Sequence, residues 1–594
     1  MPNLKSLAKD TFIYGMSSII GRFLNYLLVP LYTAKMAAST GAYGVITNVY
    51  AYTALLLVLL TFGMETTYFR FSTNEKDDPQ RVYSTTLLMV GGVCLAFVVL
   101  VLVFLQPISA WMQYPDHPEY VGTMFVCVAI DAFQCVPFAH LRRNHRPIKF
   151  AALKLLFIFL NILLNLAYFL LVPWLYAQDW GRPLVSSFYD GQLDLAWAFY
   201  INLFCTASVT FFFYKELTGF PWAFDKDLAK RMWHYSWPIL ALGVAGILNQ
   251  TADKIIFPFV TTHVGKEINV QLGIYGAAVK IAMIMTLITQ AFRYAYEPFV
   301  FSKSHDRDSK ETYAAAMKYF IIFTLLAFLV VVAYLPFFKH IIAPDYWGGL
   351  RVTPIVMVAG ILLGVYFNLS LWYKLVDKTI YGMYFSFAGC AVLVAVNVLF
   401  IPRFGYMACA WGGVAGYGVA TILSYFVGQK YYPIKYPLKS IAGYVLLTAF
   451  FFTLMQLEPA AWSAWLTMGI NTVFIILYIA HVLYHDFPIK RLPIIGKYYV
   501  ELVPRGKRPH GAVAGRVRPG WCRGRSLGAG GRVVRSDRAA PREVRSEGVA
   551  AHPVPVGDGA RPAGSGRGVG VREGRPGGRV EGRGRPDRGR LRRC

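Results

Sequence analysis

The sequence predicts an all-α polytopic membrane protein with about 14 transmembrane helices, and three observations carry this prediction. Apolar residues make up 56% of the 594 residues and charged residues only 15%, whereas a soluble domain has about 25% charged residues. Apolar stretches of about 20 residues, the length that crosses a bilayer as a helix, recur between short loops. Basic residues gather in every second loop. The predicted spans are residues 9–36, 42–63, 82–105, 120–140, 149–172, 195–214, 234–259, 270–300, 317–337, 349–373, 379–401, 405–428, 438–456 and 463–485.

The first predicted span carries a positive charge in its middle, at Arg22. A buried Arg in a spanning helix costs roughly 3 kcal/mol on insertion scales, so it normally faces a partner or a water-filled cavity. Helical spacing puts Arg22 and Asn25 on one polar stripe of the helix. We therefore expect both residues to face a central cavity, with Arg22 binding an anionic substrate. The alternatives are an Arg that snorkels to the membrane surface and one that pairs with a carboxylate.

The charges of the loops predict the orientation of the chain. Alternate loops, counted from the N-terminus, hold 25 Lys and Arg residues, whereas the other set holds six. Cytoplasmic loops of membrane proteins are enriched in Lys and Arg. We therefore expect the basic loops and both ends of the bundle to lie in the cytoplasm.

An internal repeat predicts two lobes. Gly41-Ala-Tyr43-Gly44 opens the second span, and Gly273-Ile-Tyr275-Gly276 opens the eighth, 232 residues later. Six spans precede a long basic loop and six follow it, which favours two six-helix lobes related by a pseudo-two-fold axis along the membrane normal. The expected parts are an N-terminal lobe at residues 1–214, a cytoplasmic linker at 215–233, a C-terminal lobe at 234–430, two additional helices and the cytoplasmic end at 431–504, and a tail at 505–594.

Ionisable residues inside the seventh and eighth spans are further candidates to bind substrate in the cavity, because charges in lipid are costly. They are Asp253, Lys280, Arg293 and Glu297. Asp253 could instead lie near the outer surface, and Arg293 and Glu297 could form a structural pair near the cytoplasmic end. Lys280 lies deeper and is harder to explain without a cavity. Asn and Gln residues of the spans are expected to join helices by hydrogen bonds.

Motifs of catalysis and metal binding are missing from the sequence. It has no GxSxG, P-loop or HExxH motif and no Cys or His at metal-ligand spacing, and six of its eight Cys fall inside apolar spans. Buried Cys behaves as a small apolar residue. We therefore expect a protein that is not an enzyme and that needs no cofactor and no metal.

Residues 505–594 differ in composition from the rest of the chain. They hold 22 Arg, one Lys and seven acidic residues, a net charge of +16 out of +27 for the whole chain. Such an Arg- and Gly-rich tail is expected to be disordered, and its composition also fits a frameshifted reading of GC-rich DNA. The alternatives are a tail that binds RNA or one that binds anionic lipid. The basic residues of the body lie in short loops, so no nucleic-acid partner is expected.

Four stretches give the chain a family resemblance. The opening DTFIYGMSSIIGRFLNYLLVPLYT, the GAYG that follows, residues 249–254 and LGIYGAAVKIAMI resemble the polysaccharide-biosynthesis flippases of the multidrug/oligosaccharidyl-lipid/polysaccharide exporter superfamily. The resemblance covers about Leu4 to Val500. It implies two six-helix lobes around a central cavity, in which Arg22 and Lys280 fall where such flippases carry cavity cations. A basic residue that they carry in the middle of the second span is missing here.

The resemblance also implies an activity. Such flippases move undecaprenyl-pyrophosphate-linked oligosaccharide, for example O-antigen units, across the bacterial cytoplasmic (inner) membrane by alternating access. Membrane lipid, a polysaccharide polymerase and glycosyltransferases are the implied partners. Two alternatives stay open: a cation-coupled multidrug exporter of the same superfamily, and an enzyme, a membrane polysaccharide polymerase or ligase.

Overall fold

The computed structural model describes residue 24 and residues 26–74, 77–303, 309–376, 378–459 and 462–486. In these ranges the chain is helical, without a β-strand. Twelve of its helices are long and apolar enough to cross a membrane, and the apolar helix Ala196–Phe211 is shorter. The prediction of an all-α polytopic protein is confirmed. Arg22, Asn25 and the tail 505–594 lie outside the described residues.

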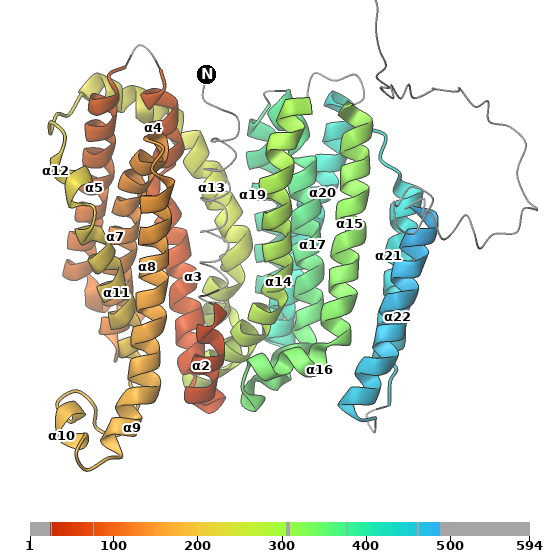
Figure 1. Cartoon of the computed structure of the whole chain (residues 1–594), viewed down its shortest axis with the longest axis horizontal. Helices are drawn as coiled ribbons and strands as arrows, with labels where there is room; N and C mark the ends of the chain where they lie inside the picture. The colour runs from red at the N-terminus through yellow and green to blue at the C-terminus, as the bar shows by residue number, and fades with distance from the viewer. Residues whose placement is uncertain are drawn as a thin grey trace, which may run out of the picture. The chain divides into compact units, whose positions relative to one another are not determined.

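The N-terminal lobe is built around α7, which packs against α3, α5 and α11 (Figure 1). Its elements are α2 (Leu28–Lys35), η1 (Ala38–Thr40), α3 (Ala42–Thr61), α4 (Met64–Ser72), α5 (Pro79–Val103), α6 (Leu105–Trp111), α7 (Pro118–Arg143), α8 (Pro147–Leu166), the π-helical turn η2 (Ala167–Leu171), α9 (Val172–Tyr176), α10 (Arg182–Val185), α11 (Ala196–Phe211) and α12 (Tyr214–Thr218).

The C-terminal lobe repeats this arrangement around α17, which packs against α14, α15 and α20. Its elements are α13 (Lys226–Val260), α14 (Lys266–Lys303), α15 (Ser309–Ala333), α16 (Leu335–Phe338), η3 (Lys339–Ile341), η4 (Pro344–Val352), α17 (Thr353–Leu369), α18 (Leu371–Leu375), α19 (Ile380–Phe404) and α20 (Tyr406–Tyr431). Two further helices, α21 (Leu438–Gln456) and α22 (Ala464–His485), follow.

Local sequence signals start several of these helices. Asp78 accepts a hydrogen bond from the backbone N–H of Gln80 at 3.1 Å, and Pro79 takes the first turn of α5. Asp225 accepts one from Leu228 at 3.0 Å and begins α13. A carboxylate that satisfies a free N–H and a Pro in the first turn both favour a helix start. Because α13 begins at Lys226, part of the predicted linker is helical.

The outer faces of the helices are apolar. On α5 the side chains of Leu95 and Val103 are 66% and 68% exposed. A soluble protein rarely exposes such a continuous apolar surface, whereas in a bilayer this surface faces lipid while the helix satisfies its own backbone. The protein is therefore a multi-pass membrane protein.

The second span is longer than predicted and is interrupted. Phe62 and Gly63 adopt positive φ angles of 32° and 73°, which end α3. The chain then continues as α4 as far as Ser72. A Cβ at Gly63 would lie 3.0 Å from the side chain of Ile239 on α13. The break therefore lets α3 and α4 pass close to the second lobe.

The two copies of the internal repeat pack against each other where the lobes meet, at the lower end of the bundle in Figure 1. A Cβ at Gly44 would lie 1.8 Å from the carbonyl oxygen of Asn269, and a Cβ at Gly276 would lie 2.3 Å from Oγ1 of Thr47. Small residues let helix backbones approach closely in membranes. The repeated glycines thus allow α3 and α14 to cross in direct contact.

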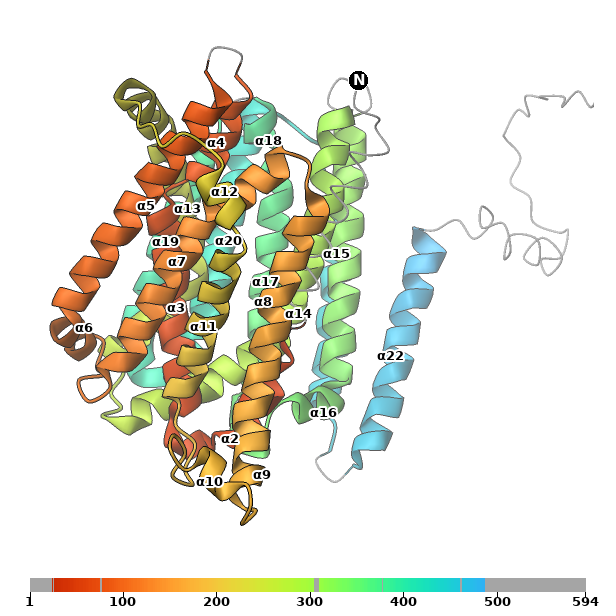
Figure 2. The same cartoon turned by 60° about the vertical axis from the view of Figure 1, so that its left-hand side comes forward.

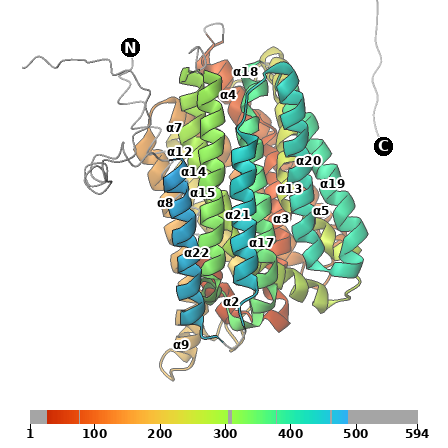
Figure 3. The ribbon, with the colours of Figure 1, turned by 90° about the vertical axis from the view of Figure 1, so that its right-hand side faces the viewer.

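The last two helices pack on α15, at one side of the C-terminal lobe (Figure 3). The Tyr478 hydroxyl of α22 donates to the carbonyl of Ile322 at 3.1 Å. At the upper end, Asp486 accepts hydrogen bonds from Lys318 of α15 and Tyr444 of α21. These contacts join α21 and α22 to α15 of the second lobe.

Candidate functional site

Two adjoining cavities lie between and within the lobes. The first, of about 400 Å³, is lined mainly by α13, α14, α17 and α20, and we call it the C-lobe compartment. The second, of about 410 Å³, is lined mainly by α2, α3, α7 and α8, and we call it the N-lobe compartment. Thr47, Tyr50, Ala54 and Lys280 line both. The compartments therefore meet along α3 and at one lysine of α14.

Lys280 is the half-buried cation at this junction. Among the residues that the structure describes, its ammonium group has no hydrogen-bond or ion-pair partner. Within the described part of the chain, the charge of Lys254 acts on Lys280 and repels it. A charge within a spanning helix normally has a counter-charge or a water-filled cavity with a ligand. This geometry makes Lys280 available to an anion.

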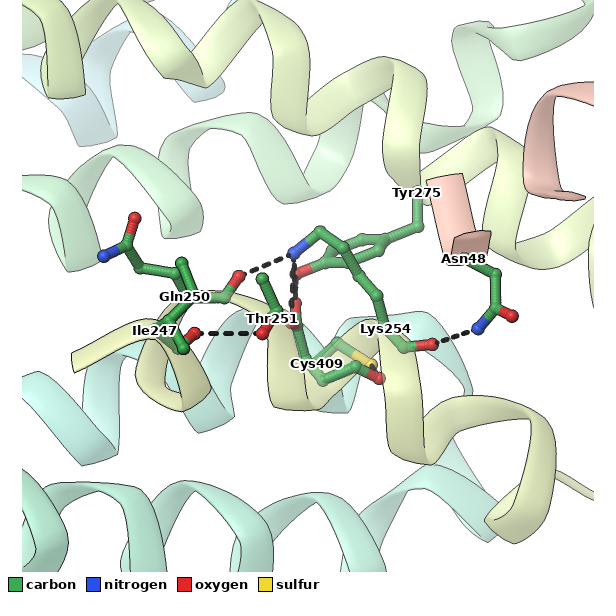
Figure 4. A network of polar contacts seen from close by, with 8 residues as sticks. Asn48, Ile247, Gln250, Thr251, Lys254, Tyr275 and Cys409 are labelled. Atoms are coloured by element: carbon green, nitrogen blue, oxygen red, sulfur yellow. Dashed lines mark hydrogen bonds and ion pairs between the residues drawn. The ribbon is translucent and has the colours of Figure 1, made fainter. Parts of the chain in front are cut away.

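A polar network around Asp253 forms one wall of the C-lobe compartment (Figure 4). The ammonium group of Lys254 lies 2.9 Å from one carboxylate oxygen of Asp253, and the Tyr275 hydroxyl donates to the same oxygen at 2.6 Å. Lys254 also donates to the carbonyl of Gln250 at 3.2 Å. Asp253 is 6% exposed. The structure thus gives this carboxylate two partners inside the bundle.

The same wall is tied to the first lobe. The side-chain amide of Asn48 on α3 donates to the carbonyl of Lys254 at 2.8 Å. The Tyr114 hydroxyl lies 3.0 Å from Asn48 Oδ1 and 3.3 Å from Asn269 Oδ1, so it is shared between α3 and α14. Together with the glycine contact at Gly44, these bonds close the cavity toward the lower end of the bundle.

The N-lobe compartment contains a carboxylate, Asp131 of α7. It interacts electrostatically with Lys154 of α8 without forming an ion pair. The Lys154 ammonium group lies 4.0 Å from the centroid of the Phe138 ring. Sequence reasoning did not single out Lys154. The signal was its spacing, because Phe157 and Asn161, three and seven residues later, line the compartment.

The eighth predicted span holds two other predicted site residues, Arg293 and Glu297. Arg293 is exposed, lies 4.9 Å over the Phe367 ring and does not line either compartment. Glu297 belongs to α14, but its side chain lies outside the described residues. The structure therefore brings together Lys280 and Asp253 around one cavity and leaves Arg293 apart from it.

Comparisons with known proteins agree with this architecture. The family model for polysaccharide biosynthesis proteins matches residues 39–343. The lipid II flippase MurJ, in an inward closed conformation, has a similar structure with a TM-score of 0.60 and 12% identity, over 80% of this chain and 99% of that one. An inward-facing multidrug resistance MATE family transporter of the MOP superfamily has a TM-score of 0.55 and 14% identity, over 71% and 95%. No curated protein sequence matches the chain.

At these identities the structural matches establish the fold, and the family model establishes the family, because it covers slightly more than half of the 594 residues. The resemblance found in the sequence is confirmed on both counts. The chain belongs to the family of polysaccharide biosynthesis proteins, and its fold is similar to those of the lipid II flippase MurJ and of the inward-facing MATE transporter.

Proposed function

We propose that the protein is a flippase that moves an undecaprenyl-pyrophosphate-linked oligosaccharide across the cytoplasmic membrane by alternating access, for the synthesis of a cell-surface polysaccharide such as O-antigen. The observation that carries the proposal is Lys280, a cation without a counter-charge among the described residues, placed where two cavities of a transporter fold meet. Family membership supports the sugar part of the substrate.

The physical reason lies in the pyrophosphate group. A phosphate cannot enter hydrocarbon without its water unless cations and hydrogen-bond donors replace that water. Lys280 supplies one charge, and Lys254 supplies a second when it leaves Asp253. Arg22 and Asn25 remain predicted donors to the phosphates. Arg293, which lines neither compartment, and Glu297, a carboxylate, remain predicted to contact other parts of the substrate. The lipid chain stays in the bilayer while the sugars occupy the aqueous cavity.

The contacts between the lobes support an alternating mechanism. At the lower end of Figure 1, Tyr346 of η4 donates to the carbonyl of Met36 at 2.7 Å, and Gln113 donates to that of Pro258 at 3.1 Å. These bonds join segments of different lobes. To release a substrate at this end, the lobes must break these two hydrogen bonds and separate Gly44 of α3 from Asn269 of α14.

The orientation of the chain in the membrane, predicted from the loop charges, and its division into lobes, predicted from the internal repeat, are part of the proposal. Turns rich in Lys and Arg, such as α7–α8 and α12–α13, lie at the upper end (Figures 1 and 2). This end faces the cytoplasm together with both termini if the charge bias holds. The predicted lobe boundaries, and a polymerase and glycosyltransferases as partners, belong to the same proposal.

A cation-coupled multidrug exporter is the second candidate, and Asp131 is the observation that favours it. This carboxylate lines the N-lobe compartment without an ion pair. Organic cations bind to such groups, whereas a pyrophosphate is repelled by them. The two candidates therefore differ in which cavity charge is essential.

The test is transport by the purified full chain in liposomes. A flippase moves a labelled undecaprenyl-pyrophosphate oligosaccharide to the other leaflet without changing its mass, and Lys280→Ala abolishes this movement. Lys35→Ala, which removes an exposed cation at the end of α2, serves as the matched control and keeps it. Transport of cationic dyes that needs Asp131 but not Lys280 would favour the exporter, and a change in substrate mass would favour an enzyme.

A further inference from the structure

Lys154 lies on the inner face of α8 although its side chain is exposed. At 100° per residue, Phe157, Ile158 and Asn161 are within about 60° of it around the helix. Phe157 and Asn161 line the N-lobe compartment and Ile158 is buried. The exposed apolar residues of α8, Phe159 and Leu163, lie on the opposite side. Lys154 itself does not line the compartment, but it lies on the same face of α8 as these residues, one to two turns nearer the upper end.

The depth of Lys154 separates it from the membrane surface. It lies seven residues after the start of α8, about 10 Å at 1.5 Å per residue, below the upper end of the bundle. The turn at that end already carries Arg146 and Lys149. Lys149 is bound to Glu216 at 2.6 Å. A lysine below these groups, within the spanning helix, is costly unless an aqueous path reaches it.

Asp131 is placed to compete for this lysine. It lines the compartment from α7 and attracts Lys154 across a gap that is too wide for an ion pair. Lys154 instead rests against the Phe138 ring. An anion entering from the upper end would thus meet an ammonium group that is attracted to, but not bound by, its own carboxylate.

We propose that Lys154 forms a first anion-binding station at the mouth of the N-lobe compartment, with Asp131 as its resting counter-charge, and that it passes the pyrophosphate of the substrate inward to Lys280. This inference rests on the proposed function. Lys154 lies nearest the upper end, Lys280 at the junction of the compartments, and Lys254 six residues, about 9 Å, from the lower end of α13. The three lysines thus follow one another from the upper toward the lower end of the bundle.

The experiment measures binding of inorganic pyrophosphate to the purified full chain in detergent by titration calorimetry at fixed ionic strength. Lys154→Gln weakens binding about tenfold, the loss of one charge-assisted contact, and Lys154→Arg restores most of it. Asp131→Asn tightens binding about threefold, because it removes a competing negative charge. A gain in affinity cannot arise from misfolding. In the Lys154→Gln background Asp131→Asn loses its effect, because the two act through one contact.

Controls separate this inference from the function on which it rests. Lys35→Gln leaves binding unchanged, and Lys280→Gln weakens it. If Lys280→Gln weakens binding while the Lys154 and Asp131 variants do not change it, the first station does not exist. If the unsubstituted chain does not bind pyrophosphate, the proposed function fails as well. An isoprenyl pyrophosphate in the same micelles should bind to the variants with the same order of affinities. If the substitutions change the affinity for inorganic pyrophosphate but not for the isoprenyl pyrophosphate, the site does not bind a lipid head group.

Discussion

Adding a single methyl group at Gly44 should favour the state in which the lower end of the cavity is open. A Cβ at this position would lie 1.8 Å from the carbonyl oxygen of Asn269 and 2.6 Å from its carbonyl carbon. Ordinary contacts begin at 3.4 Å, so α14 would have to retreat by about 1.6 Å. The neighbour is backbone and cannot turn away as a side chain would.

The size of the effect follows from the cost of overpacking, about 1–3 kcal/mol. This cost falls on the closed arrangement, because only there do α3 and α14 touch. The ratio of open to closed molecules therefore rises by a factor of about 5 to 150. Gly92→Ala is the matched control: it makes the same change within a helix, and no atom lies within 4 Å of the added carbon.

The assay measures access to Ala54, which lines both compartments. With Ala54→Cys in a chain free of other cysteines, a membrane-impermeant maleimide added outside the cell reacts when the lower end opens. The reaction should be at least fivefold faster with Gly44→Ala and unchanged with Gly92→Ala. An unchanged rate with Gly44→Ala would show that this contact does not hold the cavity closed.

Three further predictions concern other parts of the chain. Deleting residues 505–594 should leave the membrane level and transport unchanged in quantitative blots and export assays, whereas lost export at normal level would show that the tail has a role. Reporter fusions within 178–190 should report the periplasm and those within 142–149 the cytoplasm; the reverse result would contradict the orientation. Partial burial would raise the pKa of Asp486, but hydrogen bonds from Lys318 and Tyr444 hold it below its usual value. The stabilisation by these two hydrogen bonds is present above the ordinary pKa of Asp and is lost as the pH falls through the lowered pKa of Asp486. The melting temperature should therefore decrease below about pH 4, and it should decrease less in Asp486→Asn.

The fold could be predicted from the sequence because its signals are local and repeated. Apolar length, loop charge and the Gly-Xaa-Tyr-Gly repeat each act within one helix or one loop, and together they predict two lobes. The break at Phe62 and Gly63 was missed. Gly63 is a local signal for a helix end, because glycine adopts a positive φ without strain. Its close approach to Ile239, 176 residues away, is what no local pattern contains.

The site was harder to predict, because helix spacing gives a face but not what lies opposite it. For Asp253 the sequence leaves both the cavity and the outer surface open. The structure buries this residue and bonds it to Tyr275, 22 residues away. Lys154 was not singled out, although its spacing puts it on one helix face with Phe157 and Asn161. The sequence does not show that this face lines a cavity, whereas the structure does.

Lys280 should reduce the stability of the protein for the sake of its function. Asp253 has Lys254 at 2.9 Å and Asp131 has Lys154 nearby, but Lys280 is acted on by a like charge. A buried charge without a counter-charge costs free energy that an apolar residue of similar length does not. Lys280→Met should therefore raise the free energy of unfolding by about 0.5–2 kcal/mol, seen as a higher melting temperature in detergent, while transport is lost. At one fixed concentration, pyrophosphate should stabilise the unsubstituted chain more than the variant. A lower melting temperature for Lys280→Met would mean that Lys280 has a structural partner, and the anion site would then have to be sought elsewhere.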